Sequence, residues 1–193
     1  MLSRVYLEIT NRCNLSCSFC PGTKRAARRL TPEEFRRLAE KIRPHTQYLY
    51  LHVLGEPLSH PELGEILDIC RELSFKVTIT TNGTLLDRCR QTLLESGTLY
   101  KVCISLHSFE ANAAGDLEQY LSHCTAFAKA AAETGIIVQF RLWNLDGAQT
   151  KGQRTQNDEI LRYLHGAFCG EWEKRRKSIA VRHRVQRTGQ QLP

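Results

Sequence analysis

The sequence predicts an α/β fold in which parallel strands alternate with amphipathic helices. Apolar, β-branched runs recur along the chain, and between successive runs the apolar residues repeat at helical spacing instead. Polar or breaker residues follow the runs, as expected where the carboxyl ends of parallel strands meet on one rim. Right-handed crossovers repeated in this way build either an open sheet or a partial barrel.

The positive charge of the chain lies mainly near its end. A length of 193 residues fits one domain, and the net charge of +7 would suit nucleic acid. Seven Lys or Arg residues and no acid, however, stand between Lys174 and Arg187. We therefore expect a core over residues 1–170 and a basic tail over residues 171–193, without nucleic acid as a partner. The abrupt change of composition supports the hypothesis of a truncated or frameshifted end.

We expect no targeting signal in the first residues of the sequence. No apolar run precedes Glu8, and no stretch of about 18 apolar residues occurs, so we expect neither a signal peptide nor a membrane span. Clustered cysteines in such a chain are more typical of metal binding or catalysis than of disulfides. The sequence thus predicts a cytoplasmic protein.

The first strand and the first helix have clear local signals. A strand is predicted at Val5–Thr10, bounded by charged and polar residues. Thr31 is a suitable N-cap, Pro32 fits the first helical position and Glu34 closes a capping box. Apolar residues at helical spacing then continue until Pro44 ends the helix.

Strands and helices alternate through the rest of the chain. In order, we expect a strand at Tyr48–Val53, a helix opened by Pro61, a strand at Lys76–Thr80, a short helix capped by Asp87, a strand at Leu99–Ser105, a helix at Asp116–Glu133 that Gly135 stops, and a strand at Ile136–Leu142. Beyond them, we interpret Asn144–Thr155 as a loop, Asn157–Phe168 as a helix and Ser178–Val185 as a candidate sixth strand.

Three cysteines directly follow the first strand. Cys13, Cys17 and Cys20 have the spacing C-x3-C-x2-C. Three thiolates can hold three irons of a [4Fe–4S] cluster and leave the fourth iron without a protein ligand, which makes it a place for chemistry. The stretch is therefore the first candidate for a functional site.

The three cysteines also allow other interpretations. Structural zinc prefers four ligands, and neither His45 nor His52 lies at a finger-like spacing. A C-x2-C redox pair would leave Cys13 unused, and a ferredoxin would need a fourth cysteine, for which Cys169 is the late candidate. Among the remaining cysteines, Cys89 is unassigned, and we expect three to be buried small hydrophobes on apolar faces: Cys70, Cys103 and Cys124.

Further candidate residues lie at the ends of the later strands. Gly55-Glu56-Pro57 and Thr81-Asn82-Gly83 would be ordinary turns in most proteins. Arg141 lies between apolar residues of a strand, so it is either exposed at an edge or directed into a site, where a guanidinium suits a carboxylate. Ser105 and His107 end the fourth strand, and His107 is a candidate acid or base on the substrate side.

The basic stretch Lys24–Arg29 follows the three cysteines. It is either a solvated surface or a docking surface for an acidic electron donor.

Together these motifs resemble those of the radical S-adenosylmethionine (radical SAM) superfamily over about residues 4 to 145. The cysteine loop, with Phe19 before its third cysteine, resembles the cluster loop of that family. Leu54 stands where the family's GGEP motif has its first glycine. The core is similar to the subgroup that carries a C-terminal SPASM or twitch extension, but the cysteine-rich extension itself is absent from this sequence.

The resemblance implies a partial (β/α)6 TIM-like barrel, truncated after strand five or six if the end is shortened. It implies that Cys13, Cys17 and Cys20 ligate a [4Fe–4S] cluster that binds S-adenosylmethionine. Phe19 would pack near the adenine, and five residues would hold the cosubstrate: Gly55, Glu56, Asn82, Ser105 and Arg141, the last through the carboxylate.

The function implied is that of a radical SAM enzyme. One electron from reduced flavodoxin or a ferredoxin-type donor would cleave S-adenosylmethionine to a 5′-deoxyadenosyl radical, which abstracts hydrogen from an unknown substrate such as a peptide or protein. Two alternatives stay open. One is a non-catalytic or truncated iron–sulfur protein, and the other is an RNA-modifying radical SAM enzyme, which rests mostly on the charge of the tail.

Overall fold

The computed structural model describes residues 2–17, 19–110, 115–143, 151–168 and 179–184. The strands in this part are β1 (Val5–Tyr6), β2 (Tyr48–Tyr50), β3 (Lys76–Thr81), β4 (Leu99–Ser105), β5 (Ile137–Trp143) and β6 (Ile179–Arg184). The helices are α1 (Pro32–Ile42), α2 (Leu63–Glu72), α3 (Leu86–Leu94), α4 (His107–Glu110), α5 (Leu117–Glu133) and α6 (Lys151–Phe168), with a 3-10 turn at Pro57–Ser59.

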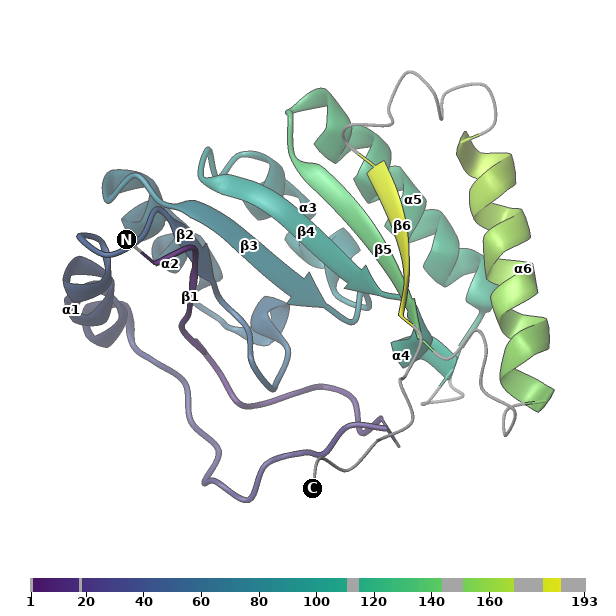
Figure 1. Cartoon of the computed structure of the whole chain (residues 1–193), viewed down its shortest axis with the longest axis horizontal. Helices are drawn as coiled ribbons and strands as arrows, with labels where there is room; N and C mark the ends of the chain where they lie inside the picture. Colours follow the sequence, from purple (N-terminus) through teal and green to yellow (C-terminus); the bar gives the residue numbers. More distant parts are fainter. Residues whose placement is uncertain (1, 18, 111–114, 144–150, 169–178, 185–193) are drawn as a thin grey trace, which may run out of the picture.

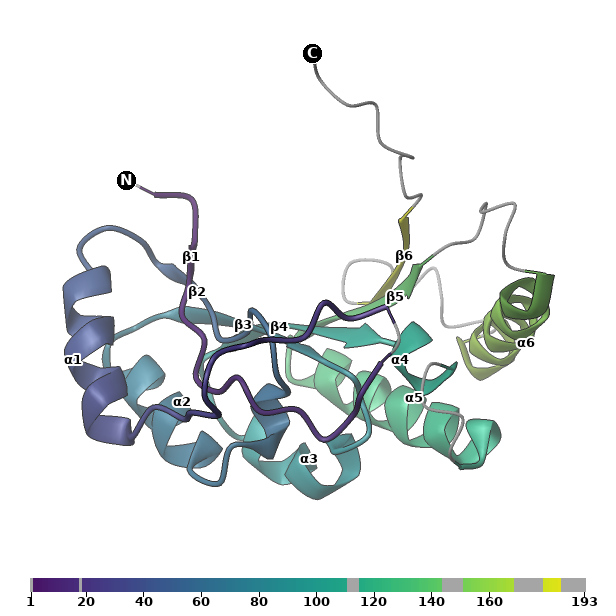
Figure 2. The same cartoon turned by 90° about the horizontal axis from the view of Figure 1, so that it is seen from below.

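The strands form one parallel sheet in the order of the sequence, β1-β2-β3-β4-β5-β6 (Figure 1). Because each strand pairs with the preceding one, every crossover advances in the same direction, without the reversal that places helices on both faces of a doubly wound sheet. The long helices accordingly lie on one side, and the sheet curls away from them at both edges (Figure 2). The sheet is a partial barrel, as the resemblance implied, with an open inner face.

Side-chain hydrogen bonds cap the first turns of α1 and α5. The Glu34 N–H donates to the hydroxyl of Thr31 at 3.2 Å, and the Thr31 N–H donates to the Glu34 carboxylate at 3.1 Å. The Asp116 carboxylate accepts from the Glu118 N–H at 2.9 Å. The predicted capping box at Thr31 is confirmed, and Asp116, which was predicted only as the start of the helix, is its N-cap.

Several predicted boundaries are wrong. The first two strands are shorter than predicted, because the chain leaves the sheet after Tyr6 and after Tyr50 to reach the loops at the rim. Asp87 lies within the first turn of α3 and does not cap it; the N-cap is Leu85, without a side-chain hydrogen bond. Residues 151–155 are helical rather than a loop.

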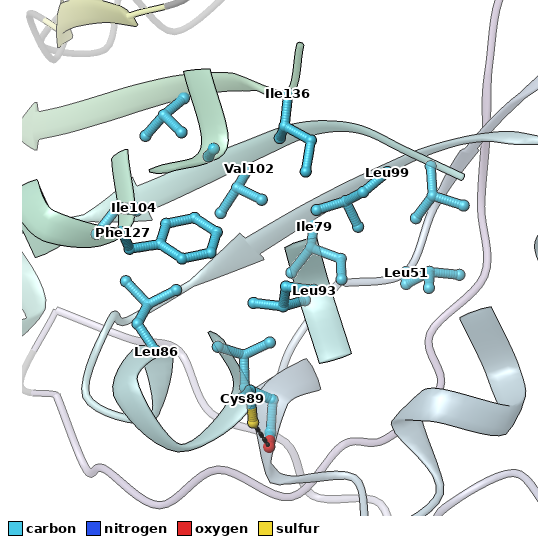
Figure 3. Close-up of a cluster of buried hydrophobic side chains, with 14 of the residues drawn as sticks. Leu51, Ile79, Leu86, Cys89, Leu93, Leu99, Val102, Ile104, Phe127 and Ile136 are labelled. Atoms are coloured by element: carbon cyan, nitrogen blue, oxygen red, sulfur yellow. Dashed lines mark hydrogen bonds between the residues drawn. The ribbon is translucent and has the colours of Figure 1, made fainter. Parts of the chain in front are cut away.

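The main core fills the space between the sheet and its helices (Figure 3). Side chains of alternate strand residues, such as Ile79, Val102 and Ile104, meet Phe127 of α5 and are at most 1% exposed. Full burial of each such side chain contributes about 1.5–3 kcal/mol. Cys89 of α3 lies at the margin of this core, where its thiol donates to the Leu58 carbonyl at 3.5 Å.

The opposite, inner face of the sheet is polar. Val102 and Ile104 enter the core, so Cys103 between them faces the inner side, and its thiol donates to the Gln139 side-chain oxygen at 3.6 Å. Cys103 is buried, as predicted, but the prediction that it lies on an apolar face is wrong. Cys70 and Cys124 are fully buried in the core, as predicted.

The predicted sixth strand is confirmed as β6. Cys169, residues 144–150 and most of the predicted tail lie outside the described residues, so the boundary at residue 170 stays a prediction. No helix in the described ranges has the length and apolar character needed to cross a membrane.

Candidate functional site

The cysteine loop crosses the carboxyl end of the sheet (Figures 1 and 2). Hydrogen bonds between Asn11 and the far end of the loop close its base: the Asn11 side chain accepts from the Arg28 N–H at 2.7 Å and donates to the Ala26 carbonyl at 2.8 Å. Thr10 and Arg29 form an antiparallel bridge just outside this pair. The loop is therefore anchored at both of its ends.

The three thiols open onto one cavity of about 480 Å3. Cys13 and Cys20 are exposed and Cys17 is half-buried, with its thiol 4.0 Å from the Ser108 carbonyl. The Gly22 N–H donates to the Cys20 sulfur at 3.4 Å. Partial burial raises the pKa of the Cys13 thiol.

A buried carboxylate joins the ends of β2 and β3. Glu56 is 2% exposed, and its two oxygens accept hydrogen bonds from the N–H groups of Leu58 at 3.0 Å and Asn82 at 2.7 Å. Burial raises the pKa of Glu56, while these N–H donors oppose the shift. The Glu56 N–H in turn donates to the Arg12 carbonyl at 2.8 Å, so this one residue contacts both strand ends and the cysteine loop.

Gly55 lies against the backbone of the cysteine loop. Its φ of +70° belongs to the left-handed region, and an added Cβ would lie 2.6 Å from the Thr10 carbonyl oxygen and 2.7 Å from that of Arg12. Only a glycine allows the loop to approach this turn so closely.

Asn82 is a second junction. Its side-chain N–H2 donates to the Asn14 side-chain oxygen at 2.9 Å and lies 4.0 Å from the Cys13 sulfur. Its backbone carbonyl accepts from the buried Tyr120 hydroxyl at 2.7 Å. Glu56 and Asn82 were predicted to hold the cosubstrate, and in this structure both are bonded to the chain itself, in positions that orient the cysteine loop.

Arg141 faces the cavity from β5. Its neighbours Phe140 and Leu142 are fully buried in the core, so alternation directs the guanidinium to the inner face, and its Nη1 lies 3.5 Å from the Thr80 hydroxyl. Ser105 is the Cα partner of Arg141 on β4 and lines the same cavity. Of the two alternatives for Arg141, the structure shows the one directed into a site.

His52 lines the cavity, although its sequence position suggested only a zinc ligand at an unsuitable spacing. Its Nδ1 accepts from the Thr80 N–H at 3.1 Å, and its Nε2 lies 2.9 Å from the Thr80 hydroxyl. The imidazole thus replaces the backbone carbonyl that a longer β2 would offer to Thr80, just where β2 leaves the sheet. The signal for it was its position two residues after Tyr50, on the same side of the strand.

His107 begins α4 and lies beside the loop. Its ring packs 4.8 Å from that of Phe19, and its Nδ1 lies 3.2 Å from the Arg141 carbonyl. Burial, together with the Arg141 charge, lowers the pKa of both His52 and His107 to about 4. Both imidazoles are therefore neutral at pH 7.

All predicted site residues line this one cavity. They come from the cysteine loop and from the ends of β2 to β5: Cys13, Cys17, Phe19, Cys20, Gly55, Glu56, Asn82, Ser105, His107 and Arg141. His52, Thr80 and Ser108 join them without having been predicted as site residues.

The fold and the site define a parallel partial barrel with a three-cysteine loop over the carboxyl ends of its strands. The chain belongs to the radical SAM superfamily, whose family model matches residues 7–147. This superfamily uses a [4Fe–4S] cluster and S-adenosylmethionine.

Individual relatives match different shares of the chain. A GTP 3′,8-cyclase of Lactiplantibacillus plantarum is 29% identical over 174 residues, or 83% of this chain and 49% of that protein. The PqqA peptide cyclase of Rhodopseudomonas palustris is 30% identical over 114 residues, or 57% of this chain and 30% of that protein. The chain thus spans half or less of the length of these curated relatives.

The crystal structure of Streptococcus suis SuiB has a similar fold. It aligns with a TM-score of 0.65 and 20% identity over 96% of this chain and 40% of that one.

The donor set of the loop fits a [4Fe–4S] cluster. Among the described residues, no three His, Cys, Asp or Glu side chains are grouped to hold one metal ion. A [4Fe–4S] cluster does not require the three thiolates of the loop to converge on one metal ion, because each thiolate binds a separate iron. Cys13, Cys17 and Cys20 fit such a cluster by opening onto one cavity, and the Asn82 and Gly22 N–H groups point to two of the sulfurs.

We predict that Gly55→Ala destabilises the protein more than Gly135→Ala. Both glycines have a positive φ, which costs an alanine about 1–2 kcal/mol, but an added Cβ at Gly135 meets nothing within 4 Å. The contact of Gly55 with the loop adds about 1–3 kcal/mol. Urea unfolding measures the free energy of unfolding of the two variants. Equal losses of stability would contradict the close approach of the cysteine loop to Gly55.

We predict that the imidazoles of His52 and His107 titrate near pH 4, and that Arg141→Met raises both midpoints. A lowered pKa in the folded protein contributes stability above pH 6.5 that is lost as the pH falls toward 4. NMR titration measures the midpoints, with His52→Gln and His107→Gln for assignment. If Arg141→Met leaves a midpoint unchanged, the guanidinium is excluded as a cause of the lowered pKa of that histidine.

Proposed function

We propose that the protein is a radical SAM enzyme that cleaves S-adenosylmethionine reductively and uses the resulting radical to abstract hydrogen from a substrate. The observation that carries the proposal is the shared cavity: three thiols open onto it from the loop, and Arg141 faces it from β5. This shared space supports a role for the thiols as cluster ligands and for the guanidinium as the partner of a carboxylate.

The cysteines would hold the cluster, and the rest of the cavity would hold the cosubstrate. When bound, the cluster supplies the electron that splits S-adenosylmethionine to a 5′-deoxyadenosyl radical. Arg141 offers its guanidinium to the carboxylate of the methionyl group, and Ser105 offers a hydroxyl beside it. Phe19, 39% exposed, has ring surface left to pack near the adenine.

The turn at Gly55 and Glu56 would contribute its backbone. The Glu56 carboxylate accepts hydrogen bonds from the Leu58 and Asn82 N–H groups. We therefore assign Glu56 and Asn82 mainly to positioning the cysteine loop, and only secondarily to contact with the methionyl amino group. His107, neutral and packed on Phe19, remains the candidate acid or base on the substrate side.

The electron would come from reduced flavodoxin or a ferredoxin-type protein. Such donors are acidic, and the loop carries Lys24, Arg25, Arg28 and Arg29 next to the third cysteine. Arg25 pairs with Glu8 at 2.6 Å and Arg28 with Glu34 at 2.7 Å, so carboxylates of the chain itself offset part of this positive charge. We place the enzyme in the cytoplasm, where such donors and reduced thiols occur.

A peptide or protein is the substrate class that we favour. The PqqA peptide cyclase supports it among the relatives, and the polar inner face of the sheet offers a surface beside the cavity. The GTP 3′,8-cyclase relative makes a nucleotide the second class to test. We propose that residues 1–170 form the main part of the catalytic core, that β6 (Ile179–Arg184) completes its sheet, and that the remaining residues of the basic segment 171–193 form a tail.

We predict that Cys17→Ala abolishes both cluster assembly and cleavage of S-adenosylmethionine. Two thiolates cannot hold the cluster securely, whereas Cys89→Ala, the matched control, removes a cysteine from the margin of the core. The measurement is 5′-deoxyadenosine formation by anaerobically reconstituted protein with dithionite.

If the wild type shows the spectrum of a cluster but forms no 5′-deoxyadenosine, the proposal of an enzyme is contradicted. That result would support a non-catalytic iron–sulfur protein. Salt-dependent RNA binding that survives deletion of residues 174–193 would instead favour the RNA-modifying alternative.

A further inference from the structure

Four tyrosines form a strip on the open inner face of the sheet. Tyr48 and Tyr50 flank Leu49, which is fully buried in the core, so both rings face the inner side. The Tyr6 ring lies 4.7 Å from that of Tyr50, and the Tyr100 ring lies 5.6 Å from that of Tyr48. Tyr6 is 49% and Tyr100 39% exposed. We call these four residues the tyrosine strip.

Cations accompany the strip. The Arg4 guanidinium lies 5.8 Å from the centre of the Tyr50 ring, and the Lys76 ammonium lies 5.6 Å from that of Tyr48. Lys101 is paired with Thr78 in the sheet and belongs to the same inner face. These positive charges give the strip a preference for an acidic partner.

The nearby carboxylate of Glu8 does not cancel these charges. Its oxygens are committed to Arg25 at 2.6 Å and to the Leu54 N–H at 2.8 Å. Its side chain is 13% exposed.

The tyrosine strip is continuous with the cavity. The His52 ring lies 5.6 Å from that of Tyr6 and 5.9 Å from that of Tyr50, and His52 itself lines the cavity. A chain that lies along the tyrosines therefore leads to His52, at the edge of the cavity that Arg141 also lines.

We propose that the tyrosine strip binds an acidic, apolar-containing peptide segment and directs it toward the cavity. The proposal rests on the proposed function, because it gives that function's substrate a surface and a charge. Tyrosines contribute large contact area at low cost in conformational entropy, and the cations select carboxylate side chains.

Other occupants fit the strip less well. The C-terminal segment of this chain carries seven cations between Lys174 and Arg187, and a second copy of the chain carries a net charge of +7, so both are repelled. Single-stranded RNA stacks its bases on open ring faces, but Arg4 and Lys76 lie over faces of Tyr50 and Tyr48, and the Tyr48–Tyr100 contact is edge-on.

The test uses the anaerobically reconstituted protein and a fluorescein-labelled synthetic peptide of alternating Glu and Leu, with its Lys–Leu counterpart. Fluorescence anisotropy should show salt-dependent binding of the acidic peptide alone. Lys76→Met and Lys101→Met should each weaken it about two- to fivefold, and Tyr6→Ala about tenfold. Lys41→Met, which removes the same charge from the last turn of α1, is the matched control and should leave the affinity unchanged.

Equal binding of the two peptides, equal effects of Lys101→Met and Lys41→Met, or tighter binding of an oligonucleotide at the same residues would overturn the proposal. Formation of 5′-deoxyadenosine is measured in the same preparations. Cleavage of S-adenosylmethionine without acidic-peptide binding overturns this inference alone. Peptide binding without cleavage overturns the proposed function and leaves the docking surface standing.

Discussion

The site depends on one buried carboxylate. Glu56 connects the ends of β2 and β3 through its bond to the Asn82 N–H, and its own N–H connects them to the cysteine loop at Arg12. A charged group at 2% exposure is costly unless it is hydrogen-bonded, so its two N–H donors must stay in place. The Asn82 side chain in turn donates a hydrogen bond to Asn14, next to the first cysteine, and so restricts the position of the loop. The loop is thereby oriented before any cofactor arrives.

The fold makes this arrangement possible. Among the described elements, strands added in the order of the sequence leave the inner face of the sheet without helices, so polar side chains can line it without disturbing the core. Arg141, His52 and Thr80 occupy that face, and the apolar residues between them on their strands face the helices. Preorganised polar groups of this kind suit a site in which the protein positions a cofactor and the cofactor performs the chemistry.

Much of this was predictable from the sequence, because local signals decided it. The capping box at Thr31 and the apolar repeats fixed the elements of the barrel, and strand ends placed Arg141 and Ser105 on the rim. The roles of Glu56 and His52 were not predictable in the same way. Both depend on hydrogen bonds to β3 across more than 25 residues of chain, and no spacing in one sequence reports such a contact. Cys103 was predicted on the wrong face of the sheet because its neighbours in the sequence, Val102 and Ile104, are apolar. Those neighbours face the core, whereas Cys103 faces the polar inner side.

The measurement that tests the role of Glu56 most directly is hydrogen exchange in Glu56→Gln. The amide would present a donor to the Asn82 or Leu58 N–H in place of an acceptor, so the constraint on the loop should weaken. We expect faster exchange in residues 10–14 and 81–84, with β4 unchanged and a lower iron content after reconstitution. Exchange in these segments equal to that of the wild type, or faster exchange throughout the sheet, would contradict the account.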